Sequence, residues 1–326
     1  MRGEFELIER YFAPLAARTP GALALEDDAA ILTPPSGEDL VFTVDTIVAG
    51  VHFLPDDPPE QVAKKLLRVN LSDLAAMGAR PLGYLLSVAL AKTVEEAWIA
   101  SFAEGLAEDQ MHFGLGVMGG DTTSTPGPAT LTLTAVGAVP QGKALRRNAA
   151  RRGDAVYVSG NIGDSALGLQ YLKGILPALD GPDAAFLTER YRLPSPRLEL
   201  GRALVKEGLA EAAIDISDGL MADLGHLCKR SGLAARIMAA AVPLSSAAQR
   251  LVEQESRHLG TALTGGDDYE LLFTASPEQA RALATLAARL DLPLTRIGEM
   301  VEGSGVTLLD AENVEIRLEY PGWTHF

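Results

Sequence analysis

The chain has 326 residues, 47% of them hydrophobic and 22% charged, which predicts a globular protein of about two domains, each with a core of its own. Its formal net charge of −15 argues against nucleic acid and anionic membrane as partners, although an anionic small molecule could bind through bridging divalent cations. No apolar run reaches the length of a membrane span and no signal peptide is evident, so we expect a cytoplasmic protein. The single cysteine, Cys228, excludes an intramolecular disulfide and favours a buried structural thiol.

The first half alternates helical and strand patterns. Its predicted elements are a helix at 5–16, strands at 29–32 and 40–45, a helix at 58–77, a strand at 82–89, a helix at 94–113, and strands at 115–118 and 130–139. In the long helix, Asn70 and Asp73 share a face, so Asp73 can point to where Asp45 ends the preceding strand. The last strand alternates threonine with apolar residues, and we expect its exposed face to lie in the sheet of a homodimer.

A basic segment separates the two halves. Between Gln141 and Arg152 the chain becomes rich in lysine and arginine, which places a boundary between domains at 1–140 and 150–326. An arginine such as Arg147 could reach a nucleotide phosphate, whereas the alternative for each of these residues is a solvated linker.

The second half predicts another α/β domain. Its strands are expected at 155–159, 212–216 and 271–273, and its helices at 198–206, 218–230 and 277–290. Ser217 is the predicted N-cap of the helix at 218–230, whose N-terminus could hold a phosphate.

The stretch from Met118 to Thr123 is the strongest functional signal. Two glycines, Gly119 and Gly120, allow a phosphate or metal cluster close to the main chain, and Asp121 is a hard oxygen ligand of the kind that Mg²⁺ prefers. The alternative is a tight turn capped by Asp121. Further aspartates stand at strand ends and helix starts, which favours a preorganised site for several metal ions: Asp27, Asp28, Asp45, Asp73, Asp215 and Asp218.

Several common catalytic motifs are absent from the sequence. There is no P-loop, no His-Glu-x-x-His zinc site and no Gly-x-Ser-x-Gly elbow. The glycines at 114, 116 and 119 match the spacing of a dinucleotide fingerprint, but the helix precedes them and the strand spans them, the reverse of that motif's context. Carboxylates, glycines, hydroxyls and a few arginines suit phosphoryl transfer by metal ions and positioning, without a catalytic side chain.

The sequence resembles the thiamine-monophosphate kinase family over nearly its whole length. The segments that carry the resemblance are 3–5, 27–29, 43–53, 70–78, 119–123, 214–220 and 265–272, in the order of the family. The resemblance implies ATP-dependent phosphorylation of thiamine monophosphate to thiamine diphosphate, the final step of that cofactor's biosynthesis. It also implies the two-domain α/β fold of aminoimidazole ribonucleotide synthetase and selenophosphate synthetase, in which the N-terminal domain binds ATP and Mg²⁺ and its sheet dimerises into a barrel.

The resemblance further implies which residues form the site. Several Mg²⁺ ions would be held by Asp28, Thr43, Val44, Asp45, Asp73, Asp121, Asp215 and Asp218. ATP would contact Gly120, Asp121, Arg147 and Ser217, with His112 near the adenine, and thiamine monophosphate would contact His52, Asp267 and Trp323. The chain departs from the family pattern at Ala24-Leu25-Glu26, where Gly-Ile-Gly is usual, at Asp267, where glutamate is usual, and at His112-Phe113, where tyrosine is frequent.

Two other functions are alternatives. Another ATP-using synthetase of the same fold is one, although the expected terminal cysteines of selenophosphate synthetase and of the hydrogenase-maturation protein are absent. The other is a non-catalytic protein that binds divalent cations, whose cation binding would not depend on ATP.

Overall fold

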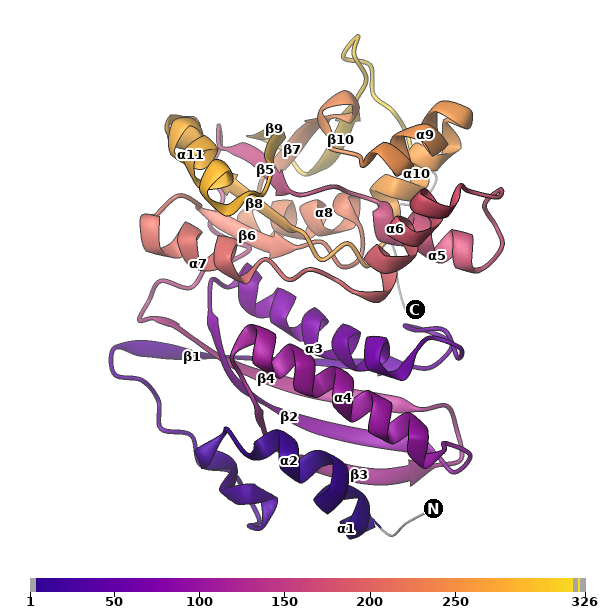
Figure 1. Cartoon of the computed structure of the whole chain (residues 1–326). Helices are drawn as coiled ribbons and strands as arrows, with labels where there is room; N and C mark the ends of the chain where they lie inside the picture. Colours follow the sequence, from indigo (N-terminus) through magenta and orange to yellow (C-terminus); the bar gives the residue numbers. More distant parts are fainter. Residues whose placement is uncertain (1–3, 319–321, 323–326) are drawn as a thin grey trace. The chain divides into compact units, whose positions relative to one another are not determined.

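The computed structural model describes residues 4–318 and Gly322, and the chain divides into two compact units (Figure 1). The N-terminal unit comprises Met1–Leu74 and Ala79–Gly142, and the C-terminal unit comprises Lys143–Phe326 together with Ala75–Gly78. No helix among the described residues is both long and apolar enough to cross a membrane.

The N-terminal unit is a four-stranded sheet in the order β1-β4-β2-β3, with α3 and α4 against one face (Figure 1). Its elements are α1 (Glu4–Leu7), a π-helical turn (Ile8–Phe12), α2 (Ala13–Ala16), a 3-10 segment (Pro20–Leu25), β1 (Glu38–Val48), α3 (Pro59–Ala76), β2 (Arg80–Ala91), α4 (Glu96–Phe113), β3 (Val117–Thr125) and β4 (Thr130–Pro140). The core lies between sheet and helices, where Leu66 and Leu74 of α3 and Leu131 and Leu133 of β4 are fully buried.

Three local predictions for this unit are wrong. Residues 29–32 form no strand, because the Ile31 amide bonds to the Gly21 carbonyl and the following Pro34-Pro35 has no N–H to offer a sheet. The strand predicted at 115–118 instead runs through Gly119 and Gly120 to Thr125, and it is an edge strand. The helix predicted at 5–16 is irregular, because a π-helical turn at Ile8–Phe12 separates α1 from α2, and Phe5 is 82% exposed.

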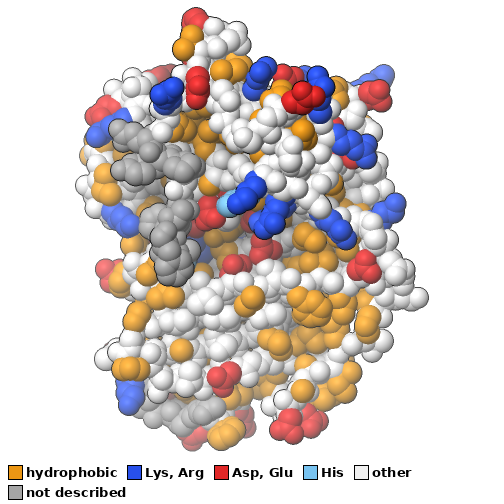
Figure 2. All heavy atoms as spheres, turned by 180° about the vertical axis from the view of Figure 1, so that it is seen from behind, with side chains coloured by type: hydrophobic (Ala, Val, Ile, Leu, Met, Phe, Trp, Pro, Cys, Tyr) orange, Lys and Arg blue, Asp and Glu red, His pale blue; other side chains and the backbone are white. Residues whose placement is uncertain are grey.

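The second face of the N-terminal sheet carries an apolar surface. Phe42, Val44 and Leu85 are 64%, 60% and 43% exposed. They share this face because Phe42 pairs with Val136 of β4, while Val44 and Leu85 pair with Thr134 from either side, and Val136 and Thr134 point the same way. Figure 2, seen from behind relative to Figure 1, shows hydrophobic side chains gathered on this unit. We call Phe42, Val44 and Leu85 the open-face patch.

The C-terminal unit is built on a six-stranded sheet in the order β10-β7-β9-β5-β8-β6. Its elements are β5 (Ala155–Ser159), α5 (Asp164–Leu172), α6 (Gly181–Arg192), α7 (Leu198–Glu207), β6 (Ala212–Asp215), α8 (Leu220–Ser231), β7 (Ala234–Met238), a 3-10 turn (Ala239–Ala241), α9 (Ser246–Gln254), α10 (Arg257–Thr264), β8 (Leu271–Ala275), a 3-10 turn (Pro277–Gln279), α11 (Ala280–Leu290), β9 (Leu294–Val301) and β10 (Gly305–Leu309).

One helix of this unit begins later than its sequence predicts. The N-cap of α8 is Gly219, at a φ of 110°, so Ser217 is not the cap. Ser217 lies instead in the loop that joins β6 to α8. The prediction for Cys228 is confirmed, since its side chain is fully buried in the core between α8 and the sheet.

Candidate active site

Thr43, Asp45 and Asp73 form the first acidic group, which we call the β1 group. Thr43 and Asp45 alternate on β1 and therefore face the same side, toward α3, where Asp73 lies. The Thr43 hydroxyl donates to Asp73 Oδ2. Burial and, second to it, the nearby charge of Asp73 together raise the pKa of Asp45 to about 7. A carboxyl group whose pKa is raised beside a second carboxylate forms a site suited to a divalent cation.

A buried amide lies one helical turn before Asp73. Asn70 is fully buried and donates from Nδ2 to the Leu66 carbonyl, while its Oδ1 accepts no hydrogen bond from the described residues. A carbonyl oxygen without a donor, on the helix face of Asp73, is the type of atom that a hard cation coordinates. The donor set of the β1 group therefore fits Mg²⁺. Val44, between Thr43 and Asp45, turns its side chain to the open face.

A cavity of about 310 Å³ lies at the β3 edge of the sheet. Its polar lining, which we call the β3 group, consists of Asp27, Asp28, Gly119, Gly120 and Asp121. Gly120 has a structural reason to be glycine, because a Cβ there would lie 1.8 Å from the Leu86 carbonyl oxygen of β2. The sequence indicated only that glycine allows a ligand close to the main chain, and strand pairing is a second reason for it. The same residue both permits close strand pairing and leaves main chain open to the cavity.

The sheet separates the β1 and β3 groups. Asp45 pairs with Leu133, Leu133 with Leu86, and Leu86 with Gly120, so one row of residues crosses all four strands. Asp121 belongs to the next row, with Thr46, and faces the opposite side. Three strand spacings place Asp45 and Asp121 on the order of 14 Å apart. Because Mg²⁺ binds oxygens at about 2.1 Å, one ion cannot contact both carboxylates in one protomer.

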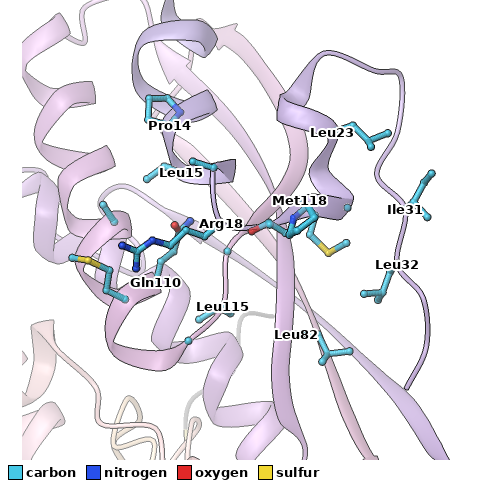
Figure 3. Close-up of a pocket in the computed structure, with 18 of the residues that line it drawn as sticks. Pro14, Leu15, Arg18, Leu23, Ile31, Leu32, Leu82, Gln110, Leu115 and Met118 are labelled. Atoms are coloured by element: carbon cyan, nitrogen blue, oxygen red, sulfur yellow. The ribbon is translucent and has the colours of Figure 1, made fainter. Parts of the chain in front are cut away.

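A larger cavity of about 870 Å³ lies beside the β3 group and is lined mainly by apolar side chains (Figure 3). Met118 lines both cavities, and Arg18 is a charged side chain at this one. Its size and apolar walls suit an aromatic ring system. Met111 and Gly114 line it, whereas the ring of the intervening His112 packs edge-on against Phe113 with centroids 4.5 Å apart.

His52 lies in the turn that follows β1. Its Nδ1 accepts a hydrogen bond from the Val48 amide at 3.1 Å, and its own amide donates to the Val48 carbonyl. These two contacts hold the imidazole beside the end of β1, the strand that carries Thr43 and Asp45.

The C-terminal unit carries a third acidic group around the loop between β6 and α8. Asp215 is buried at the end of β6, and Ser217 and Asp218 follow it. Asp223 Oδ2 accepts from the amides of both Ser217 and Asp218 at 3.0 Å. The side chains of Asp218, Asp223 and His226 approach within 4.8 Å of one another, close enough to hold a metal ion.

Asp223 is a candidate site residue that our sequence interpretation missed. Burial and the charge of Asp218 raise its pKa, the amides of Ser217 and Asp218 and the charge of Arg147 lower it, and the net result is a pKa of about 7. Arg147 therefore lies near this group, and its carbonyl accepts a hydrogen bond from Ser231. An acidic residue in the first turn of the helix after Ser217-Asp218-Gly219 was the available signal.

Asp267 lies in a turn that is joined to the same loop. The amide of Asp267 donates to the Ser217 carbonyl at 2.9 Å, and a Cβ on Gly266 would lie 2.3 Å from that same oxygen. Asp267 and Tyr269 both have positive φ, at 72° and 51°. Each such residue costs about 1–2 kcal/mol, and strain of this kind is concentrated at functional sites. Trp323 lies outside the described residues.

Two family models match the chain, "AIR synthase related protein, N-terminal domain" over residues 26–139 and its C-terminal counterpart over 151–311. The thiamine-monophosphate kinase of Escherichia coli K12 is 44% identical over 99% of this chain and 98% of that protein. The chain belongs to the thiamine-monophosphate kinase family. That of Bacillus subtilis is 33% identical over 99% of both chains.

Solved structures of the thiamine-monophosphate kinase family share this fold. The enzyme from Stenotrophomonas maltophilia K279a has a TM-score of 0.84 at 44% identity, covering 94% of this chain and 96% of that one. A structure of AaThiL complexed with AMPPCP and TMP has a TM-score of 0.79 at 32% identity, covering 100% and 99%. The hydrogenase maturation protein HypE of E. coli, at 21% identity, shares the fold alone. The predicted two-domain fold is confirmed.

Proposed function

We propose that this protein is an ATP-dependent kinase that phosphorylates thiamine monophosphate to thiamine diphosphate. The observation that carries this proposal is that AaThiL, 32% identical over essentially the whole of both chains, is found in complex with AMPPCP and TMP. AMPPCP is ATP with a methylene in place of the β–γ bridging oxygen, so the pair represents a phosphoryl donor and its acceptor.

The carboxylates of the chain suit this reaction. In the proposed site, Asp28, Asp45, Asp73, Asp121, Asp215 and Asp218 bind Mg²⁺ ions, joined by oxygens of Thr43 and Val44. Bound Mg²⁺ neutralises the charges of the donor and acceptor phosphates. An acceptor phosphate with a second pKa of about 6 is largely ionised at neutral pH and needs no general base. We therefore assign no catalytic acid or base.

The remaining residues position the two substrates. Gly120, Asp121, Arg147 and Ser217 contact ATP, and the apolar cavity beside the β3 group holds the adenine, next to His112. The guanidinium of Arg147 can bind a phosphate by two parallel hydrogen bonds. His52, Asp267 and Trp323 contact thiamine monophosphate. Held in line by these contacts, the acceptor oxygen attacks the γ-phosphorus of ATP directly, without a phosphoenzyme.

A homodimer would complete the site. The open-face patch is apolar and exposed in one protomer, which favours its burial against a second sheet. If two sheets close a barrel about a two-fold axis along its length, the β1 edge of each protomer meets the β3 edge of its partner. The β1 group and the partner subunit's β3 group would then stand on neighbouring strands, with Asp45 on the outer and Asp121 on the inner face of the barrel. In this arrangement each active site takes its acidic groups from both protomers.

The test is direct product analysis. We expect purified protein with Mg²⁺, ATP and thiamine monophosphate to form thiamine diphosphate and ADP in equal amounts, measured by chromatography. Reactions without ATP, with EDTA in excess of Mg²⁺, or with unphosphorylated thiamine as acceptor serve as controls. Cation binding that is unaffected by ATP, with no thiamine diphosphate formed, would instead support a non-catalytic cation-binding protein.

A further inference from the structure

The turn from Asp267 to Glu270 has two differently exposed faces. Asp268 and Glu270 are fully buried, whereas Asp267 and Tyr269 are half-buried. Carboxylates are rarely buried unless opposite charge and hydrogen bonds compensate them, so the burial of Asp268 and Glu270 needs an explanation. Its partners come from segments far away along the chain.

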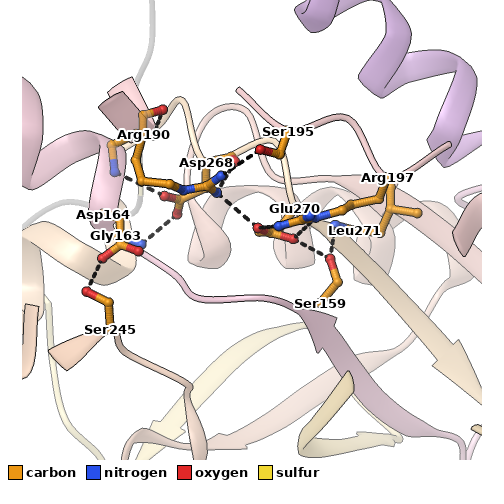
Figure 4. A network of polar contacts seen from close by, with 11 residues as sticks. Ser159, Gly163, Asp164, Arg190, Ser195, Arg197, Ser245, Asp268, Glu270 and Leu271 are labelled. Carbon is orange, nitrogen blue, oxygen red and sulfur yellow. Dashed lines mark hydrogen bonds and ion pairs between the residues drawn. The ribbon is translucent and has the colours of Figure 1, made fainter. Parts of the chain in front are cut away.

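Glu270 is held by two arginines (Figure 4). It accepts from Arg190 Nη2 at 3.0 Å, from Arg197 Nε at 2.6 Å, and from Arg197 Nη2. The Ser159 hydroxyl, at the end of β5, also donates to it at 2.6 Å and accepts from the Leu271 amide. This bidentate, doubly charged arrangement fixes the carboxylate in position and direction.

Asp268 is held by the start of α5 (Figure 4). Its Oδ2 accepts from the Gly163 amide at 2.7 Å, and its Oδ1 from the Ser165 amide at 3.5 Å. Arg190 also donates to the Asp268 carbonyl, at 3.4 Å, so one guanidinium contacts two residues of the turn. Because these contacts come from β5, α5, α6 and the segment before α7, the turn cannot shift without disturbing all of them.

The contacts of Asp268 and Glu270 also fix the two half-buried residues of the turn, Asp267 and Tyr269. The Tyr269 hydroxyl donates to Asp267 Oδ1 at 3.2 Å, and both residues keep the left-handed backbone that the buried anchors impose. The turn is also bonded to the Ser217 loop, since the Tyr269 amide donates to the Ile216 carbonyl at 2.8 Å. A half-buried phenol ring beside a carboxylate presents an aromatic face and a negative charge, which together suit a cationic aromatic ring.

We propose that Tyr269 is a further acceptor-binding residue, paired with Asp267 for the thiazolium of thiamine monophosphate, and that Asp268 and Glu270 are the positioning residues that hold this pair. The inference rests on the proposed function and extends it. In this chain an aspartate stands where the family usually has glutamate, so the Tyr269 hydroxyl sets the direction of a shorter carboxylate.

The test compares Tyr269→Phe and Glu270→Gln with wild type by calorimetric titration of thiamine monophosphate and by steady-state kinetics. Loss of one hydrogen bond to a carboxylate should raise both the Kd and the KM for thiamine monophosphate about 3- to 10-fold in Tyr269→Phe. We expect its kcat, its KM for ATP and its Tm to stay near wild type. Glu270→Gln should raise the same KM at least as much and also lower Tm, since two half-buried guanidinium groups lose their buried counter-charge.

The controls are Tyr171→Phe, which removes a phenol hydroxyl elsewhere in the unit, and Glu207→Gln, which breaks the surface ion pair with Arg289. Neither should change the KM for thiamine monophosphate. Wild-type affinity in Tyr269→Phe, or an equal rise in the KM for ATP, overturns the inference while the kinase function stands. A wild-type protein that neither binds nor phosphorylates thiamine monophosphate overturns the proposed function, and this inference with it.

Discussion

Asp45 and Asp121 lie at opposite edges and on opposite faces of the same four-stranded sheet. If each active site joins the β1 group of one protomer to the β3 group of the other, two inactive variants can restore each other. We expect Asp45→Asn and Asp121→Asn to be folded and inactive when each is assayed alone. After the two are mixed and their subunits exchanged, about a quarter of wild-type activity should return, because half of the dimers are mixed and each has one intact site.

A matched mixture controls this experiment. Asp45 and Asp73 belong to the same group, so a mixture of Asp45→Asn with Asp73→Asn leaves every site damaged and should stay inactive. Absence of recovery in the Asp45→Asn and Asp121→Asn mixture, with subunit exchange demonstrated by a tag on one variant, would contradict the shared site.

We predict that the open-face patch forms a dimer interface and that a charged side chain placed in it prevents dimerisation. Wild-type protein should show by light scattering a mass twice the 34.4 kDa of the chain at micromolar concentration. Phe42→Glu places a carboxylate within an apolar interface and should yield a folded monomer without kinase activity. Phe186→Glu, at a 38% exposed phenylalanine of the C-terminal unit, should leave the mass unchanged. A wild-type monomer would count against the barrel.

Asp164 predicts a loss of stability as the pH rises. It is fully buried, it accepts from the Ser245 hydroxyl at 2.5 Å, and its Oδ2 has no partner among the described residues. Burial raises its pKa from 3.8 to about 6, so the folded state holds a proton that the unfolded state has released. The contribution of Asp164 to the free energy of unfolding is therefore fully present below about pH 4. It is lost as the pH rises through 6, and the total loss is about 3 kcal/mol.

Asp164→Asn should remove this dependence. Urea unfolding should find the variant more stable than wild type by about 1–3 kcal/mol at pH 8 and nearly equal to it at pH 4.5. The control Asp183→Asn breaks the exposed ion pair with Arg250 and should give no gain at pH 8. An equal destabilisation of Asp164→Asn at both pH values would show that the buried carboxylate is not protonated in the folded state.

We predict that Ala24→Gly stabilises the protein. Leu23, Ala24 and Leu25 all have positive φ, between 50° and 60°, where the family usually has glycines nearby. Ala24→Gly relieves a Cβ clash and should stabilise the protein by about 1 kcal/mol in urea unfolding. Ala30→Gly, at a residue without positive φ, should instead lower stability. If both variants lose stability alike, the left-handed segment does not form in solution.

Much of the fold was predictable because its signals are local. The strands around Asp45 and the helix that carries Asp73 follow from alternation and from helical spacing over a dozen residues, and both were correctly predicted. The extension of β3 through Gly119 and Gly120 was not predictable, because glycine is a poor strand former and only pairing with β2 holds those residues extended. Likewise, the cap of α8 depends on the turn around Gly219 rather than on Ser217.

The sequence alone determined which residue types the site contains, since runs such as Gly119-Gly120-Asp121 carry their chemistry in consecutive positions. The tertiary structure alone decided how those residues are grouped. Strand order places Asp45 and Asp121 apart, although both end up in one sheet. It also brings Ser159 to Glu270 across 111 residues of chain. Register and long-range pairing are set by which faces become buried when the whole chain packs, and no short stretch of sequence contains that information.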